Sequence, residues 1–216
     1  MLSIDKLIKE EKDVYGKLFV DLNLDQELTE QFLSEDESKQ RTYIVKRDIL
    51  KNYISLMGHI ENYNSSHMIL KYVKSFSNAN SIKRYKSLNY TSLVQLSECS
   101  KCICLHCDKN CLFKACLGCS DNSYITNCDK TTLNVRAHQK YVVGLQNNTT
   151  MKNGVFNVLY TLKDCSSGSM FIVLKSPKNV EQIILNYYPS STGDTYGEVK
   201  DSVIFDKIVS IIKVIR

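Results

Sequence analysis

Residues 99–128 read CSKCICLHCDKNCLFKACLGCSDNSYITNC and hold eight of the nine cysteines of this 216-residue chain. The stretch contains three Cys-x-x-Cys pairs, and each pair can offer two thiolates to one metal ion from a tight turn. Eight thiolates would complete two tetrahedral zinc sites with four cysteine ligands each. We therefore predict a structural zinc module at residues 98–130, holding two Zn²⁺ ions.

The predicted ligands are Cys99, Cys102, Cys104, Cys107, Cys111, Cys116, Cys119 and Cys128. One assignment joins the pairs at 99/102 and 116/119 around one ion and leaves the other four cysteines for a second ion. His106 could replace one cysteine, and His138 could join the set from a following strand. The spacing leaves the pairing open. The pattern resembles those of zinc-ribbon and treble-clef modules, and this resemblance is one of spacing alone.

Three other cysteine chemistries compete with zinc. The spacing at positions 99, 104 and 107 is that of plant-type iron–sulfur proteins, although the flanking pattern differs. A disulfide framework needs an oxidising compartment, and nine is an odd number of cysteines. A thiol-redox centre needs a single Cys-x-x-Cys, so the other thiols would be surplus. Cys165, beside an expected turn, is interpreted as a plain thiol.

The remaining composition, with 43% hydrophobic and 24% charged residues, is that of an ordinary globular protein. No run approaches the roughly 18 apolar residues of a membrane span, and acidic residues interrupt the N-terminal segment where a signal peptide is apolar. We expect a reducing compartment, the cytoplasm or nucleus, where thiolates bind metal. Frequent Asn, Ser, Lys, Ile and Tyr are typical of AT-rich coding, as in a low-GC bacterium, its phage, a protist or a large DNA virus.

The hydrophobic pattern predicts an α+β chain of three parts: an α-helical region at 1–97, the zinc module at 98–130, and an antiparallel β-sheet with a closing helix at 131–216. Helical periodicity occurs at 3–19, after residue 25, at 39–61 and at 68–76, with breaks expected at 62–66 and 77–81. Strands are expected within 132–146, 154–162, 170–175 and 180–188, and a loop at 190–197. The closing helix would bury Ile204, Ile208, Ile211, Ile212 and Ile215.

The net charge of +5 is unevenly distributed, at −7 over residues 1–37, +9 over 38–114 and +3 over 115–216. Either the acidic arm pairs with the basic middle, or the basic middle binds a polyanion. Lysines and an arginine could meet phosphates while tyrosines stack on unpaired bases. The predicted nucleic-acid contacts are Lys71, Lys74, Lys83, Arg84, Lys86, Lys101, Tyr85 and Tyr90. The alternative is a solvated helix face whose tyrosines belong to the core.

The sequence contains none of the common phosphate-loop, dinucleotide, nucleophile-elbow or His-Glu-x-x-His motifs. An all-cysteine zinc site leaves no coordination position for a reacting water. We therefore expect a non-enzymatic regulatory or assembly factor, stabilised by zinc and associated with nucleic acid in transcription or replication. A protein–protein adaptor with purely structural zinc is the first alternative, and an iron–sulfur or thiol-redox protein the second. The expected partner is nucleic acid or a protein complex, without a membrane or a small-molecule substrate.

Overall fold

The computed structural model describes residues 4–30, 42–66, 71–107, 120–146, 153–178 and 180–215, except for the side chains of 23–30, 42–45 and 71–76. The chain divides into two units, Met1–Ser100 and Lys101–Arg216. The described part of the first unit is helical, and the second holds an antiparallel sheet with a C-terminal helix. The predicted α+β class is therefore confirmed. The zinc module as a separate part at 98–130 stays a prediction.

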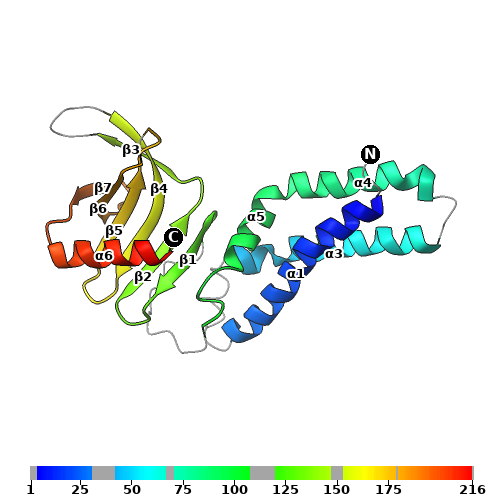
Figure 1. Cartoon of the computed structure of the whole chain (residues 1–216), viewed down its shortest axis with the longest axis horizontal. Helices are drawn as coiled ribbons and strands as arrows, with labels where there is room; N and C mark the ends of the chain where they lie inside the picture. The colour runs from blue at the N-terminus through cyan, green and yellow to red at the C-terminus, as the bar shows by residue number, and fades with distance from the viewer. Residues whose placement is uncertain are drawn as a thin grey trace. The chain divides into compact units, whose positions relative to one another are not determined.

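The helical unit is organised around its second described helix (Figure 1). Its helices are α1 (Ile4–Glu30), α3 (Thr42–Ser66), α4 (Lys71–Leu88) and α5 (Tyr90–Cys99). α3 packs against each of the other three. Apolar side chains from all of these helices are buried, among them Ile8, Leu18, Leu22, Leu50, Tyr53, Met57, Ile82, Leu93 and Leu96. Because these residues recur at helical spacing, each helix contributes one apolar face to a common core.

The helices are longer than the sequence predicts. α1 continues through residues 20–25, so the separate helix expected after residue 25 is wrong, and the buried Leu22 extends the apolar face of α1. The breaks expected at 62–66 and 77–81 are also wrong. There the hydroxyls of Ser65, Ser66 and Ser81 donate to the carbonyl four residues earlier. Polar residues that often favour turns are thus accommodated inside a helix by local hydrogen bonds.

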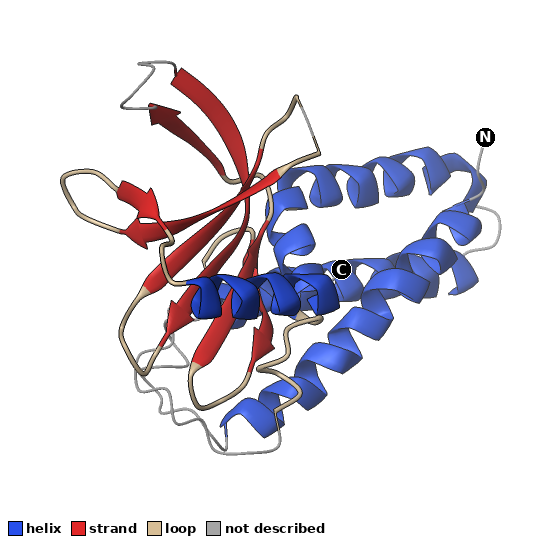
Figure 2. Cartoon of the chain, turned by 60° about the vertical axis from the view of Figure 1, so that its left-hand side comes forward, coloured by secondary structure: helices blue, strands red, loops and turns tan. Residues whose placement is uncertain are grey.

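The second unit is built on an antiparallel sheet that Figure 2 shows with a helix lying across one face. The strands are β1 (Ser123–Cys128), β2 (Leu133–His138), β3 (Val142–Gln146), β4 (Asn153–Asp164), β5 (Met170–Lys175), β6 (Gln182–Tyr188) and β7 (Thr195–Glu198). Their order is β1-β2-β4-β5-β6-β7, with β3 also paired to β4. The helix is α6 (Ser202–Ile215).

Two irregularities shape the middle of this sheet. β2 and β3 lie along the same edge of β4, opposite its second and first halves respectively. Residues 139–141 separate the end of β2 from the start of β3, and Lys140 in this break has a left-handed φ of 58°. β4 carries a bulge between Val158 and Tyr160, which shifts its register against β5. Because a bulge adds one residue, the side chains of β4 exchange faces at this point.

The described residues of the sheet form two apolar clusters. On the α6 side, Ile208 and Ile212 pack with Leu133, Val135, Leu162, Phe171 and Val173, and Ile204, Ile211 and Ile215 complete the helix contact. The five-isoleucine face predicted from the sequence is therefore confirmed. The second cluster contains Val143, Val158, Ile172 and Leu174, bordered by Tyr141, Phe156, Tyr187 and Tyr196. The central strand β5 contributes to both clusters and is buried over four consecutive residues.

In the described part of the chain, the sheet has seven strands instead of the four expected. One additional strand, β7, begins inside the expected loop at 190–197 and pairs with β6, where Tyr196 stacks on Tyr187 with 5.7 Å between ring centroids. Another, β1, lies within the predicted zinc module. The remaining difference is the division of 132–146 into β2 and β3. Within the described residues, no helix combines the length and apolar character required to cross a membrane.

Candidate metal centre and basic surfaces

The described cysteines lie at a helix end, in a turn and at a strand end. Cys99 is the last residue of α5 and is buried. Cys102 is also buried, and Cys104 and Cys107 are half-buried in the turns that follow. The N–H of Leu105 donates to the Cys102 carbonyl at 3.1 Å, which closes a tight turn at residues 102–105, between the pairs 99/102 and 104/107.

This turn is joined to the sheet by its backbone. The N–H of Ile103 donates to the carbonyl of Ile125 on β1 at 3.0 Å. The strand continues from Ile125 to Cys128, its last residue. A backbone bond between the start of the cysteine-rich segment and β1 thus fixes the path of the chain beside a strand that ends in another predicted ligand.

The loop after Cys128 is shaped to support a thiolate. The N–H of Lys130, which has a left-handed φ of 62°, donates to Cys128 Sγ at 3.3 Å. An N–H donor favours the negatively charged form of sulfur, which is the form that binds metal. Asp129 Oδ1 accepts N–H bonds from Thr131, Thr132 and Leu133, at 3.0, 2.6 and 2.7 Å. The chemistry and local geometry at Cys128 therefore fit a metal ligand.

Asp129 is ionised over a wide pH range because its hydrogen bonds outweigh its burial. Burial by itself raises the pKa of this carboxyl. The hydrogen bonds that the carboxylate accepts together lower the pKa by a larger amount and hold it well below its usual range. The largest of these contributions comes from the Thr132 hydroxyl, followed by the backbone N–H groups of Leu133, Thr132 and Thr131. The carboxylate consequently stabilises the turn between β1 and β2 wherever the fold persists.

The complete ligand set stays a prediction. Cys111, Cys116 and Cys119 lie outside the described residues. Among the residues that the structure describes, no group of three or more His, Cys, Asp or Glu side chains is close enough to hold a metal ion. His106 is exposed in the turn after Cys102. His138 lies at the end of β2 and its Nε2 atom is 2.9 Å from Thr161 Oγ1, so this nitrogen contacts a hydroxyl on β4.

The predicted nucleic-acid residues separate into exposed and internal groups. Lys83 and Arg84 are exposed on α4, and Tyr90 is 52% exposed at the start of α5. Tyr85 stacks on Tyr53 with 5.4 Å between ring centroids, and its hydroxyl donates to a carbonyl of α3 at 2.9 Å. Lys86 also turns inward. The structure thus favours the core interpretation for Tyr85.

The other predicted contacts are less informative. Lys71 and Lys74 belong to α4, and their side chains lie outside the described part. Lys101 is exposed but belongs to the second unit. The structure therefore describes Lys83, Arg84 and Tyr90 as the exposed members of the predicted set in the helical unit.

Lys86 joins a polar cluster inside the helical unit. Its Nζ atom donates to both oxygens of Glu11, at 2.7 and 2.9 Å, and lies 5.2 Å from the centre of the Tyr15 ring. Burial by itself lowers the pKa of Lys86, but the Glu11 hydrogen bond and nearby charges outweigh it and raise that pKa. Glu11 also accepts a hydrogen bond from the Tyr53 hydroxyl at 2.9 Å. The acidic arm and the basic middle therefore pair within the molecule at this point.

The sheet contains a hollow that sequence reasoning missed. Its volume is about 690 Å³, and residues from the β2–β3 break, the β4 bulge and the β5–β6 turn line it. His138 borders this hollow, and burial, with a smaller contribution from the charge of Arg136, lowers its pKa to about 4. The Lys140-Tyr141 and Ser176-Pro177-Lys178 segments were visible in the sequence. Only the strand pairing places them around a common space.

Comparison with known proteins gives no relative from which a role could be transferred. No protein-family model matches the chain, and no curated protein or solved structure is significantly similar to it. Its function must therefore be argued from its own residues.

Proposed function

We propose that this chain is a non-enzymatic, zinc-stabilised regulatory or assembly factor that associates with nucleic acid through Lys83 and Arg84. The observation that carries the proposal is the exposure of these two neighbouring cations on α4, together with the 52% exposed Tyr90 on α5. Neither cation forms an ion pair with another described residue. Both can therefore neutralise phosphates and release counterions without first losing an acidic partner.

The role proposed for zinc is structural. The predicted ligands are all thiolates, and a tetrahedral ion with four thiolates has no open position for water or substrate. Zinc would instead supply folding free energy to a segment with little apolar content. The N–H of Lys130 supports this role because it donates to Cys128 Sγ and so favours the thiolate form of this cysteine.

The binding surface is tested by reversing its charge. We expect Lys83→Glu/Arg84→Glu to weaken binding of single-stranded DNA and RNA oligonucleotides by at least about tenfold, since each phosphate contact is a charge-assisted hydrogen bond. The control, Lys9→Glu/Lys51→Glu, makes the same change in net charge at exposed positions of α1 and α3. Fluorescence anisotropy at two salt concentrations measures affinity and its salt dependence.

Equal losses in the two double variants would contradict the proposal, because they would show dependence on net charge alone. Full retention of binding by Lys83→Glu/Arg84→Glu would do the same. Lys86 is left unchanged, since its replacement would remove the partner of Glu11 and destabilise the helical unit. Thermal unfolding of each variant establishes that a loss of binding does not result from unfolding.

A protein–protein adaptor is the second candidate function. It is favoured by exposed apolar surface where α4 meets α5: Leu88 is 75% exposed and Tyr90 is 52% exposed. Tyrosine is enriched among the residues that anchor protein interfaces, and Leu88 adds apolar area next to Tyr90. This alternative predicts a protein partner that remains bound at high salt and after nuclease treatment, and that is lost in Leu88→Ser/Tyr90→Ser.

A further inference from the structure

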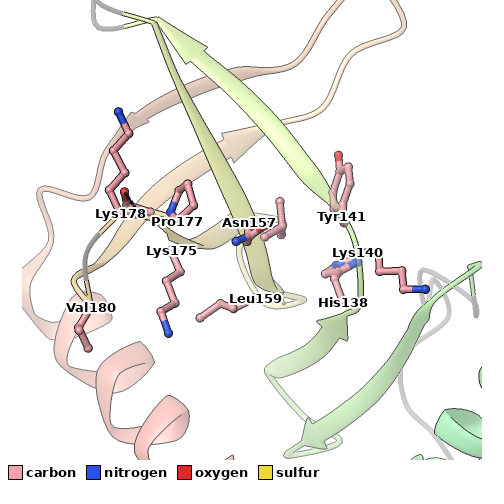
Figure 3. A pocket seen from close by; sticks show the side chains of 11 residues that line it. His138, Lys140, Tyr141, Asn157, Leu159, Lys175, Pro177, Lys178 and Val180 are labelled. Carbon is pink, nitrogen blue, oxygen red and sulfur yellow. Dashed lines mark hydrogen bonds between the residues drawn. The ribbon is translucent and has the colours of Figure 1, made fainter.

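Within the described part of the sheet, β3 has one paired edge and one open edge. β4 pairs with β3 over its five residues in a regular antiparallel register, and no described strand lies on the other side of β3. Figure 3 shows β3 leaving Tyr141 beside the part of β4 that carries Asn157. The backbone groups on the outer side of β3 are therefore available to a further strand.

The direction of these backbone groups follows from a hydrogen bond at the start of β3. The carbonyl of Tyr141, one residue before the strand, accepts the N–H of Val158 on β4 at 2.8 Å. Hydrogen-bonded and non-hydrogen-bonded pairs alternate along an antiparallel ladder, so the N–H and C=O of Val142, Gly144 and Gln146 point away from β4. None of the described residues forms a hydrogen bond with these three N–H and three C=O groups.

The other two edge strands of the described sheet carry features that disfavour a further strand. On β1, the carbonyl of Ile125 already accepts the N–H of Ile103 at 3.0 Å. β7 is four residues long and includes the charged Glu198. Charges, prolines, bulges and short strands are the means by which natural sheets prevent edge-to-edge pairing. β3 contains no charged residue and no proline, and its register with β4 has no bulge, so its edge lacks these protections.

Apolar side chains lie beside this edge on both faces of the sheet. On one face, Val142 is 50% exposed, and Val155, the partner of Gly144 on β4, is 62% exposed. On the other face, Val143 is buried in the second apolar cluster and Leu145 packs against it. A strand added to β3 would therefore gain side-chain contacts as well as backbone hydrogen bonds.

We propose that this edge pairs with the same edge of a second copy of the chain, so that the two sheets join across a two-fold axis at Gly144. In antiparallel order, Gly144 faces the same residue of the second copy, and Val142 faces Gln146. Each such pair exchanges two hydrogen bonds, so all the outward groups of both strands gain partners. On the cluster face, Val143 faces Leu145, and each copy extends the apolar cluster of the other.

The sequence of β3 suits pairing with itself. The strand is uncharged, so a second copy brings no like charges opposite one another. Glycine occupies the centre, where two identical side chains would otherwise meet, and aliphatic residues flank it on both sides. Five residues a side is fewer than the roughly 20–30 of a standard interface, so the expected dimer is reversible. The pairing does not depend on Lys83 or Arg84.

The dimer is tested by placing charges at its centre. A Cβ atom at Gly144 would meet no heavy atom within 4 Å apart from its chain neighbours, so a longer side chain fits the single copy. We expect sedimentation equilibrium of the full-length protein to show monomers and dimers exchanging between about 10 μM and 1 mM. Gly144→Lys and Gly144→Glu should each raise the dissociation constant at least about threefold, because like charges then face one another.

An equimolar mixture of Gly144→Lys and Gly144→Glu should restore the dimer, because opposite charges then meet at the two-fold axis. Val155→Lys is the matched control, since it adds the same charge on the same face of the sheet. In the proposed dimer, the two copies of this residue lie three strand spacings apart, about 14 Å. This separation exceeds the Debye length of about 8 Å at physiological salt, so the dissociation constant should equal that of the wild type.

Amide hydrogen exchange provides a second measurement. In the wild type, the N–H groups of Val142, Gly144 and Gln146 should exchange more slowly at high protein concentration than at low concentration, because the second copy accepts their hydrogen bonds. Thermal unfolding of each variant establishes that a loss of dimer does not result from unfolding.

Four outcomes would overturn the proposal. The first is the mass of a single copy at every concentration. The second is a wild-type dissociation constant in both Gly144 variants, which would place any dimer interface elsewhere. The third is a mixture of the two variants that associates no better than either one alone. The fourth is a mass that grows beyond the dimer, because a two-fold contact closes after two copies.

Discussion

Glu11 joins three helices through hydrogen bonds with two other side chains. It accepts bonds from Lys86 on α4 and Tyr53 on α3, and its own side chain is 13% exposed. A partly buried carboxylate that loses its cation retains the cost of desolvation. Breaking such a pair therefore lowers the free energy of unfolding by more than breaking an exposed pair does. The adjacent Glu10, 53% exposed and 3.9 Å from Lys6, provides the contrast.

We predict that Glu11→Gln lowers the free energy of unfolding by roughly 1–2 kcal/mol, because the amide retains the shape but not the charge that Lys86 requires. Glu10→Gln should change it by less than about 0.5 kcal/mol, as expected for an exposed pair. Urea unfolding followed by circular dichroism measures both values. Equal effects of these neighbouring substitutions would show that the Glu11–Lys86 pair contributes no more than an exposed pair.

His138 gives the sheet unit a predicted dependence on pH. Burial first, and then the Arg136 charge, lower its pKa from the ordinary 6.5 to about 4. Between pH 4 and pH 6.5 the unfolded state therefore binds more protons at this histidine than the folded state does. The free energy of unfolding consequently falls as the pH falls from 6.5 through 4. The loss from this group approaches about 3 kcal/mol when protonation is complete.

We expect His138→Gln to remove this part of the pH dependence, because glutamine can still bond to Thr161 but does not titrate. His59→Gln, at an exposed position of α3, is the matched control and should leave the dependence unchanged. Urea unfolding of the sheet unit at a series of pH values between 4 and 7 measures the difference. An unchanged slope in His138→Gln would contradict the assignment of a depressed pKa to this residue.

At the scale of elements, α6 shows how the buried face of a helix can be predicted from the spacing of its isoleucines. Its five isoleucines form the face that packs on the sheet, while Val203 and Val214 remain 76% and 82% exposed. Apolar residues occur on the exposed side of the helix as well, so composition alone does not identify its buried side. The spacing of isoleucines at three and four residues does, because that interval returns a side chain to the same face.

We predict that Ile208→Ala destabilises the sheet unit by about 2–4 kcal/mol, since a 1% exposed side chain leaves a cavity when it is truncated. Val214→Ala on the same helix should stay within about 0.5 kcal/mol. Thermal and urea unfolding of the two variants provide the comparison. A similar loss for Val214→Ala would indicate that the exposed side of α6 contacts another part of the protein or a partner.

At the scale of the whole molecule, the predicted zinc ions would add folding free energy where apolar burial is limited. We expect protein purified without added metal to contain about two zinc ions per chain and no visible absorbance, as eight thiolates imply. Chelation should lower the melting temperature and increase amide exchange at residues 101–107 and in β1. Iron with a broad visible band would instead support the iron–sulfur alternative, and few titratable thiols without metal would support disulfides.

Sequence alone determined the features that depend on local chemistry and periodicity. The α+β class, the isoleucine face of α6, and the location of the helical and strand-rich parts follow from repeats of 3.6 and 2 residues. The expected helix breaks are wrong because serine hydroxyls can also bond within a helix, to the carbonyl four residues earlier.

Tertiary structure alone decided the features that need residues distant in the sequence. Lys86 and Tyr85 looked like surface residues until Glu11 and Tyr53 were placed beside them. β7 forms because β6 offers it a partner, and the lysine-lined hollow exists because a bulge and a strand break meet across β4. Many residues of the chain are chemically able to serve as the partner of a given side chain or strand. Which of them becomes the partner depends on the three-dimensional path of the chain, because this path decides which distant residues lie side by side.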